Sequence, residues 1–309
     1  MPTSDGKIRV LAIAGGGIRG IIPAKILAEI EARTGKRIHE LFDMVCGTST
    51  GGILACGLTK PNPITANEAL GLYLNRGKEI FSASWWQAVK SLGNTLGPKY
   101  DGKGLWSVLS GVFGSHYLES AIVPTFVTAY AIERRVPIFF KSWVEGHTRQ
   151  LVDVCMATSA GPTYFPPVEV SGDWYVDGGT IDNNPALSGV IEACMKYQVH
   201  TKDVLLLSIG CGSNQSAIDH KKAMGWGNLG WVQPVLSITM DGVADKTHYQ
   251  LCDLLPDKNY LALQTSLLEE NASLDSTKPQ NLAILLAKAQ ALVDANSGSL
   301  AEFCDRLKG

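Results

Sequence analysis

Two strand-turn-helix units open the chain and constrain its fold most strongly. The first begins with the apolar run KIRVLAIA at residues 7–14, and apolar residues at helical spacing follow its glycines over residues 21–33. The second begins with the run at residues 42–46 and continues into the small-residue segment TSTGGILACGL. Repeated units of this kind are typical of parallel strands joined by crossover helices. The sequence therefore predicts an α/β fold with a mostly parallel central sheet.

The rest of the chain extends this pattern with one interruption. Between about residues 62 and 117 the strand signal lapses, and we expect an inserted helical cap there. We expect a single domain over residues 1–309, with a C-terminal helical region at about 212–309. The other predicted elements are a hairpin at 124–132 and 137–143, a helix at 152–160, a strand at 174–176, a helix opened by Asn183-Asn184-Pro185 with Asn as N-cap, a buried strand at 204–209, helices near 231–255 and 281–295, and a strand at 260–264.

Composition indicates a folded protein and argues against nucleic acid as a partner. Hydrophobic residues make up 45% of the chain, which is enough for a sizeable core, and the net charge of −2 gives no electrostatic reason to bind DNA or RNA. The seven cysteines are scattered without zinc-ligand spacing, which suits a reducing cytoplasm and predicts no zinc site. We expect neither a metal nor a cofactor. No signal-like segment opens the sequence and no run of 18 apolar residues occurs. We therefore expect a cytoplasmic protein.

The segment GGGIRG at residues 15–20 fits the G-x-G-x-x-G pattern and allows two interpretations. In a dinucleotide-binding fold such glycines surround a pyrophosphate, and an acidic residue ends the next strand to hold the ribose. Here the next strand ends at a Gly-x-Ser turn, while Glu40 and Asp43 precede or begin that strand. The alternative is that the glycine N–H groups form an oxyanion hole beside a nucleophile on the neighbouring turn.

A candidate nucleophile, Ser49, lies in the segment GTSTG at residues 47–51. A G-x-S-x-G turn between a strand and a helix holds its serine in a strained conformation with the hydroxyl exposed, and flanking glycines avoid clashes where the chain reverses. The helix N-terminus that follows stabilises negative charge nearby. The alternative interpretation is a small-residue turn with a structural serine.

A serine hydroxyl needs a base, and Asp177 fits this role better than any histidine. None of the six histidines ends a well-predicted strand, whereas Asp177 closes the strand at 174–176 and precedes Gly178-Gly179. A Ser–Asp dyad follows if the site desolvates this carboxylate without neutralising it. The alternative for Asp177 is a turn in which its side chain only caps local N–H groups.

Taken in order, GGGIRG, GTSTG and DGG resemble the signatures of the patatin-like phospholipases, and the resemblance covers about residues 7–211. The segments ATSAGP at 157–162 and NNP at 183–185 also look like that family. The resemblance implies a three-layer α/β/α fold and metal-free hydrolysis of phospholipid acyl esters, with Ser49 acylated and Asp177 activating first Ser49 and then water. It also implies an oxyanion hole built from Gly15, Gly16, Gly17 and Arg19.

The resemblance further implies partners. A membrane phospholipid is the expected substrate, with peripheral association at the membrane surface. The C-terminal third is more similar to bacterial members, some of which are antiphage effectors activated by cyclic nucleotides, so a cyclic oligonucleotide activator is a further expectation. A homodimer stays open. Two other functions also stay open: a nucleotide-binding oxidoreductase, and a non-catalytic lipid-binding or storage protein.

A tryptophan-rich segment at residues 81–114 carries Trp85, Trp86 and Trp106 beside lysines. Tryptophan next to basic residues suits the membrane interface, which predicts that this segment covers the lipid entry and docks on headgroups. The alternative is a packing layer against the main sheet.

Overall fold

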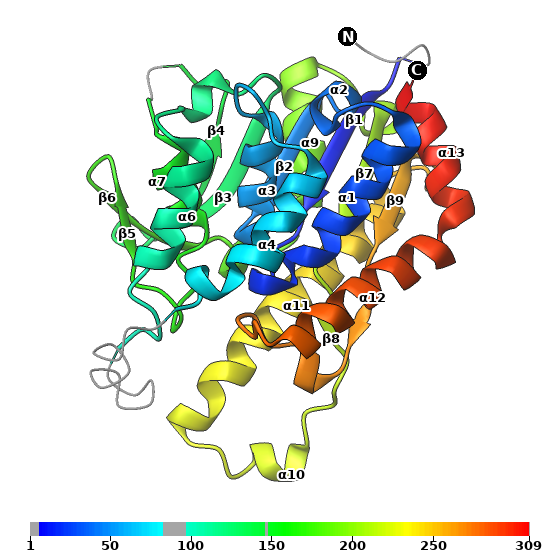
Figure 1. The fold of residues 1–309 in the computed structure, drawn as a ribbon. Coiled ribbons are helices and arrows are strands. Elements are labelled where there is room, and N and C mark those ends of the chain that lie inside the picture. The colour runs from blue at the N-terminus through cyan, green and yellow to red at the C-terminus, as the bar shows by residue number, and fades with distance from the viewer. Residues whose placement is uncertain (1–5, 83–96, 146–147, 309) are drawn as a thin grey trace.

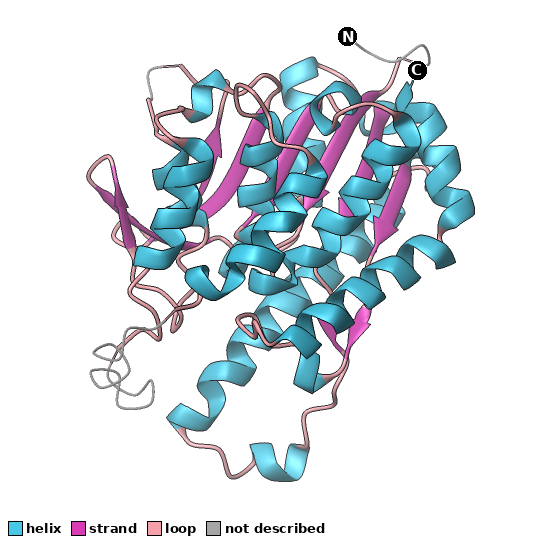
Figure 2. Cartoon of the chain, in the orientation of Figure 1, coloured by secondary structure: helices cyan, strands magenta, loops and turns pink. Residues whose placement is uncertain are grey.

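A computed structural model describes residues 6–82, 97–145 and 148–308, and a mixed β-sheet runs through its centre (Figures 1 and 2). Its strands, with one further short pair, are β1 (Ile8–Ile13), β2 (Met44–Thr48), β3 (Thr125–Ala131), β4 (Val136–Lys141), β5 (Val168–Val170), β6 (Asp173–Asp177), β7 (Val204–Ile209), β9 (Tyr260–Leu263), and the pair β8 (Ser213–Asn214) and β10 (Ser266–Leu267). The order in the main sheet is β5-β6-β3-β2-β1-β7-β9, with β4 paired to β3.

The centre of the sheet is parallel, as the two opening units predict. Strand β1 pairs in parallel with β2 and β7, β2 with β3, and β7 with β9. The antiparallel strands of the main sheet are β4, β5 and β6. Strand β4 pairs with the edge of β3 opposite β2, while β6 pairs with the last three residues of β3 beyond the end of β2, and β5 pairs with β6. The predicted hairpin is confirmed as the β3–β4 pair.

Helices cover both faces of this sheet. The helices of the described residues are α1 (Ile21–Thr34), α2 (Ile38–Leu41), α3 (Thr50–Thr59), α4 (Ala66–Ile80), α6 (Lys103–Phe113), α7 (Leu151–Thr158), α8 (Gly179–Asp182), α9 (Ala186–Tyr197), α10 (His220–Ala223), α11 (Asn228–Leu254), α12 (Pro279–Ala295) and α13 (Ser297–Lys308), with a 3₁₀ turn at Gly17–Gly20. The helices predicted at 21–33, 152–160, 231–255 and 281–295 correspond to α1, α7, α11 and α12.

Alternation along the strands divides the core between the two faces. Leu11 and Ile13 of β1 pack in one cluster with residues of α1, α4, α12 and α13, while Val10 and Ala12 pack in another with residues of α9 and α11. Side chains of successive strand residues point to opposite faces, so a strand buried on both sides needs apolar residues throughout. The fold is therefore a three-layer α/β/α sandwich, as expected.

The helix after Asn183-Asn184-Pro185 begins differently from the prediction. Pro185 is the N-cap residue of α9, and α8 ends three positions earlier at Asp182. The Asn184 side chain still accepts a hydrogen bond from the Ala186 N–H at 3.3 Å. Asn as N-cap is thus wrong for Asn183, because the chain there follows directly from α8 with backbone angles in the right-handed helical region.

The region expected to form a cap contains α4, the undescribed residues 83–96 and α6. Leu70 and Tyr73 of α4 pack in the same core cluster as β1, and α6 packs beside α7. Trp85 and Trp86, for which membrane docking is predicted, lie outside the described residues. Trp106 of α6 is described and has 55% of its surface exposed.

The carboxyl ends of the parallel strands meet at one edge of the molecule, opposite the two termini (Figure 1). The loop at residues 14–20 follows β1 there, and Ser49 follows β2. Short helix α10 and the first half of α11 project from the same edge. No helix in the described part of the chain combines the length and apolarity needed to cross a bilayer.

Candidate active site

Ser49 occupies a strained turn between β2 and α3. Its backbone has φ 54° and ψ −124°, a conformation that non-glycine residues rarely adopt. The strand before it is fully buried and the helix after it begins at Thr50, so the chain must reverse within one residue. Gly47 and Gly51 are required here, because a Cβ at Gly47 would collide with the Gly51 carbonyl and one at Gly51 with the Ile13 carbonyl. This geometry is that of a nucleophile elbow.

Hydrogen bonds from neighbouring elements fix the elbow. The Ser49 N–H donates to Thr158 Oγ1 at 2.9 Å, and the Thr158 hydroxyl donates to the Thr128 carbonyl at 2.7 Å. The Thr48 hydroxyl donates to the Asp182 carbonyl at 2.6 Å. Helix α7, strand β3 and helix α8 therefore all hold the turn that carries Ser49.

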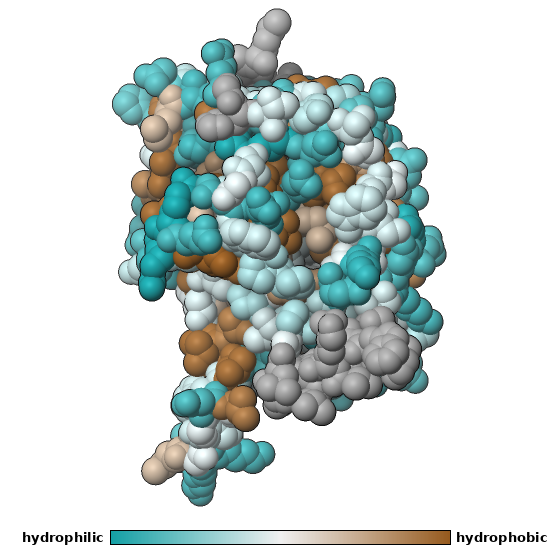
Figure 3. Space-filling model, turned by 90° about the vertical axis from the view of Figure 1, so that its left-hand side faces the viewer, coloured by the Kyte–Doolittle hydropathy of each residue, from teal (hydrophilic) through white to brown (hydrophobic). Residues whose placement is uncertain are grey.

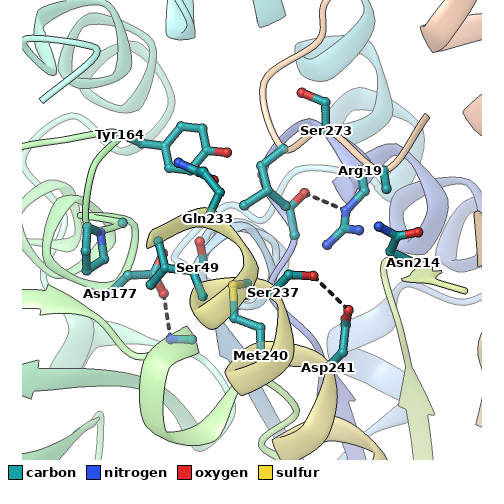
Figure 4. A pocket seen from close by; sticks show the side chains of 18 of the residues that line it. Arg19, Ser49, Tyr164, Asp177, Asn214, Gln233, Ser237, Met240, Asp241 and Ser273 are labelled. Carbon is teal, nitrogen blue, oxygen red and sulfur yellow. Dashed lines mark hydrogen bonds between the residues drawn. The ribbon is translucent and has the colours of Figure 1, made fainter. Parts of the chain in front are cut away.

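Asp177 ends β6 and lies beside Ser49 (Figure 4). The Ser49 side chain lies next to its carboxylate, and the Gly179 N–H donates to Asp177 Oδ1 at 2.7 Å. Gly178 lets the chain approach β3, because a Cβ there would collide with the Thr128 hydroxyl. Burial raises the pKa of Asp177 to about 6, although the neighbouring Ser49 side chain and the Gly179 N–H lower it. The group is thus an anion near neutral pH and close to its titration point.

The glycine loop offers fewer free N–H groups than its sequence predicts. The Gly15 N–H donates to the Asn183 carbonyl at 2.9 Å, so it is already engaged. Among the described residues no hydrogen-bond acceptor engages the N–H of Gly16, Gly17 or Thr50. The role of Gly15 is instead close packing, since a Cβ there would lie 3.2 Å from the Ser49 Cβ and would collide with the Asn183 side-chain oxygen.

Arg19 is buried on the opposite side of the cavity from Asp177 (Figure 4). Its Nε donates to the Gly16 carbonyl at 3.3 Å, so the side chain braces the loop. Burial lowers the pKa of Arg19, and the nearby Cys211 and Asp241 raise it. Arg19 therefore places a positive charge beside the two unengaged glycine N–H groups.

A segment from the C-terminal third covers the glycine loop. The Ile18 N–H donates to the Leu274 carbonyl at 2.8 Å, and any Cβ at Gly17, where φ is 57°, would collide with that carbonyl. Asp275 in the same segment pairs with Lys99 and accepts a hydrogen bond from the Tyr100 hydroxyl at 2.8 Å. A dinucleotide pyrophosphate would need the place that Leu274 occupies.

Ser49 and Asp177 open into one cavity of about 490 Å³. Gly16, Gly17 and Arg19 line the same space. The wall away from these polar residues is apolar and includes Ile53, Ile80, Phe81, Leu105, Phe165, Leu236 and Met240. A cavity with a few convergent polar groups and a long apolar wall suits a ligand with an acyl chain.

Within the described residues, no histidine contributes to this cavity. In the described ranges no three His, Cys, Asp or Glu side chains are grouped to hold a metal ion. Of the groups predicted for the site, Ser49, Asp177, Gly16, Gly17 and Arg19 line the cavity, and Gly15 lies directly beneath Ser49.

The sequence model of the patatin-like phospholipase family matches residues 11–190. That stretch contains the glycine loop, Ser49 and Asp177 and covers more than half of the chain. The chain belongs to the patatin-like phospholipase family. Membership places it among lipid acyl hydrolases.

Relatives in this family match nearly the whole chain. Patatin-like protein 2 of Oryza sativa subsp. indica is 32% identical over 94% of this chain and 84% of its own length. Probable inactive patatin-3-Kuras 1 of Solanum tuberosum is 30% identical over 93% of this chain and 86% of its own. Among solved structures, VipD from Legionella pneumophila aligns with 95% of this chain and 68% of that one, at 12% identity and a TM-score of 0.48. Because one relative is named as probably inactive, the site residues carry the argument for activity.

Sequence reasoning missed the residues that support the site from a distance. Thr158 lies in the ATSAGP segment that already resembles the family, so its position was signalled but its contact with the Ser49 N–H was not. Asn183 lies in the NNP segment, and its carbonyl engages the Gly15 N–H. Leu274 lies beyond the resemblance, and no local pattern marks it.

Proposed function

We propose that the chain is a serine lipid acyl hydrolase that cleaves phospholipid acyl esters through a Ser49–Asp177 dyad. One observation carries this proposal: residues 128 positions apart meet in one cavity, where the strained Ser49 lies beside a carboxylate whose pKa is about 6. A base of that pKa is matched to proton transfer near neutral pH.

The first half of the reaction forms an acyl-enzyme. Asp177 takes the Ser49 hydroxyl proton while Ser49 Oγ attacks the ester carbonyl carbon, and the carbonyl oxygen becomes an oxyanion. The Asp177 carboxyl then returns the proton to the departing alcohol oxygen as the ester bond breaks. In the second half, Asp177 takes a proton from water, the hydroxide attacks the acyl-serine, and the proton returns to Ser49 Oγ as the fatty acid leaves.

Backbone donors would stabilise both oxyanions. The unengaged N–H groups of Gly16 and Gly17 on one side and Thr50 at the start of α3 on the other are the candidates, since donors fixed in place need no reorganisation. Arg19 acts through its hydrogen bond to the Gly16 carbonyl, which orients the loop. Gly15 supports this arrangement by close packing rather than as a donor.

The two other functions are less well supported. An oxidoreductase would need a ribose-binding acid at the end of β2, where Thr48 and Ser49 stand, and a loop free for pyrophosphate, where Leu274 lies. A storage protein would not need a desolvated carboxylate beside a strained serine, since each costs stability. The family relative named as probably inactive keeps this second alternative worth testing.

The test is hydrolysis of fluorogenic esters and phospholipid vesicles by wild type, Ser49→Ala and Asp177→Asn. Both variants should lose activity by at least about 10³-fold, as removal of a nucleophile or its base does. Cyclic di- and trinucleotides should be added in parallel, because an activator stays part of the expectation for this chain. Hydrolysis that survives Asp177→Asn and vanishes on replacing one histidine would replace the dyad with a triad.

A further inference from the structure

An arm formed by residues 216–239 extends beyond the body of the molecule at the edge that holds the site (Figure 1). It contains α10, the turn at 224–227 and the first three turns of α11. The Trp226 and Trp231 rings pack edge to face with centroids 5.1 Å apart, which fixes the turn between the two helices. The arm is therefore a defined hairpin of two helices.

The arm exposes large apolar side chains to solvent, whereas the solvent-facing side of a helix usually carries polar residues. Met224 is 86% exposed and Leu229 is 76% exposed. On α11, Val232, Val235 and Ile238 recur at intervals of three, so they share one outward face. Figure 3 shows apolar surface on the projecting part of the molecule. The further exposed apolar residues of the arm are Ile218 and Trp231.

The charge of the arm is complementary to an anionic surface. Lys221 and Lys222 follow His220 near its tip, and Asp219 is the single acidic residue between positions 216 and 240. The Asp219 carboxylate is engaged in capping α10, where it accepts a hydrogen bond from the Lys221 N–H at 2.9 Å. The chain as a whole carries a net charge of −2, so this positive segment is a local feature.

The arm is continuous with the wall of the catalytic cavity. Lys222, Trp226 and Gln233 line that cavity, as do Leu236 and Met240 on the inner face of α11. One helix thus presents apolar side chains inward to the cavity and outward to solvent. A lipid that leaves a bilayer at this arm would therefore lie beside the wall of the cavity.

We propose that the arm at residues 216–239 inserts its outward apolar face into the interfacial region of an anionic phospholipid bilayer and delivers lipid to the cavity. Tryptophan, aliphatic and basic side chains together are the composition that favours this depth of a membrane. This inference rests on the proposed function, because a hydrolase of membrane lipids must reach its substrate in the bilayer. The proposal places membrane docking at residues 216–239, whereas the sequence alone predicts docking by residues 81–114.

The experiment uses vesicle binding in the Ser49→Ala background, so that no lipid is consumed. Large unilamellar vesicles of phosphatidylcholine with phosphatidylglycerol, and of phosphatidylcholine alone, are sedimented with the protein. Leu229→Ser/Val235→Ser is the arm variant. The matched control is Ile191→Ser/Met195→Ser on α9, whose side chains are 48% and 64% exposed and lie outside the arm. A second pair of variants tests charge. Lys221→Glu lies in the arm, and Lys246→Glu, on α11 beyond the arm, is its control; both lysines are exposed.

The arm variant should bind anionic vesicles at least about tenfold more weakly than the Ser49→Ala parent, while the control pair leaves binding unchanged. Lys221→Glu should weaken binding to anionic vesicles, and Lys246→Glu should not. With Ser49 intact, hydrolysis of a soluble short-chain ester should be the same in the arm variant and wild type. That last readout separates docking from catalysis, because failure of the dyad abolishes ester hydrolysis and leaves vesicle binding intact.

Equal vesicle binding by the arm variant and its control would overturn the proposal. A change of oligomeric state in the arm variant, with no effect on vesicle binding, would also overturn it and assign the face to a second copy of this chain. Circular dichroism of each variant checks the fold, which replacement of exposed side chains should leave intact.

Discussion

Thr158 and Ser49 form the contact that holds the turn of the candidate nucleophile in place. The Thr158 hydroxyl accepts a hydrogen bond from the Ser49 N–H at 2.9 Å and donates one to the Thr128 carbonyl at 2.7 Å. Because a strained backbone persists only where its surroundings determine it, this bridge between α7 and β3 keeps φ of Ser49 at 54°. The backbone strain at Ser49 is thus sustained by residues more than 75 positions away.

Replacing Thr158 by valine should therefore weaken both stability and catalysis. The change keeps the shape of the side chain but leaves the buried Ser49 N–H without its acceptor, which costs about 1–3 kcal/mol of unfolding free energy. The maximal rate should fall because the Ser49 turn relaxes. Chemical denaturation and ester kinetics measure the two effects.

Thr59→Val is the control for that substitution. Thr59 is buried, donates to the Ala55 carbonyl at 2.7 Å and accepts from the Thr125 hydroxyl at 2.8 Å, but does not line the cavity. It should lose comparable stability with an unchanged rate. Equal rates for both variants would show that Thr158 has a structural role alone.

The acid limb of the pH profile should report Asp177. Its pKa in the folded protein is about 6, and the base must be ionised to accept a proton, so activity should fall as pH drops through 6. The pKa lies above the usual value of 3.8, so the folded state binds the proton more tightly than the unfolded state. The Asp177 charge therefore costs stability above pH 6, and that cost disappears below about pH 4.

Asp177→Asn should thus abolish hydrolysis while raising the unfolding free energy at pH 7 by about 1–3 kcal/mol. Asp182→Asn is the matched control, because burial also raises the pKa of Asp182 to about 6 and its side chain bonds Ser188 rather than a cavity residue. It should stabilise the protein and keep wild-type activity with the same acid limb. Full activity of wild type at pH 5 would exclude Asp177 as the titrating base.

Ser49→Gly should be more stable than Ser49→Ala, although both should be inactive. Glycine adopts φ 54° without steric cost, whereas alanine keeps the strain of the native serine. We expect a difference of about 1 kcal/mol in unfolding free energy in favour of glycine. The same pair at Ser159, where φ is −105°, should show the opposite order, since glycine there only adds freedom to the unfolded chain.

Gly17→Ala should abolish hydrolysis with a loss of stability larger than that of a matched glycine. Gly17 and Gly35 have φ of 57° and 67°, so alanine is strained at both. A Cβ at Gly17 would collide with the Leu274 carbonyl, while a Cβ at Gly35 meets nothing within 4 Å. Gly35→Ala should lose about 1 kcal/mol and stay active. Activity retained in Gly17→Ala would argue against this loop as the oxyanion hole.

Much of the fold could be predicted from local sequence patterns. The apolar runs at 7–14 and 204–209 predict strands, the second of them a buried parallel strand, and the structure confirms both as neighbours in a parallel sheet. The cap at residues 62–117 stays a prediction, with Trp85 and Trp86 outside the described residues. The roles of Ser49, Asp177 and the glycines likewise stay predictions, although the structure places them around one cavity.

The sequence by itself determined the elements and the turns that carry the candidate chemistry, because strand and helix periodicity, glycine conformation and the order of the motifs are local properties. Only the tertiary structure decided that the Gly15 N–H is taken by Asn183, that Leu274 covers the loop and that Thr158 holds Ser49. These contacts join residues more than 100 positions apart. Which residues meet in these contacts depends on how the layers pack against each other. That packing produces no periodic pattern in the sequence, so it could not be predicted from the sequence.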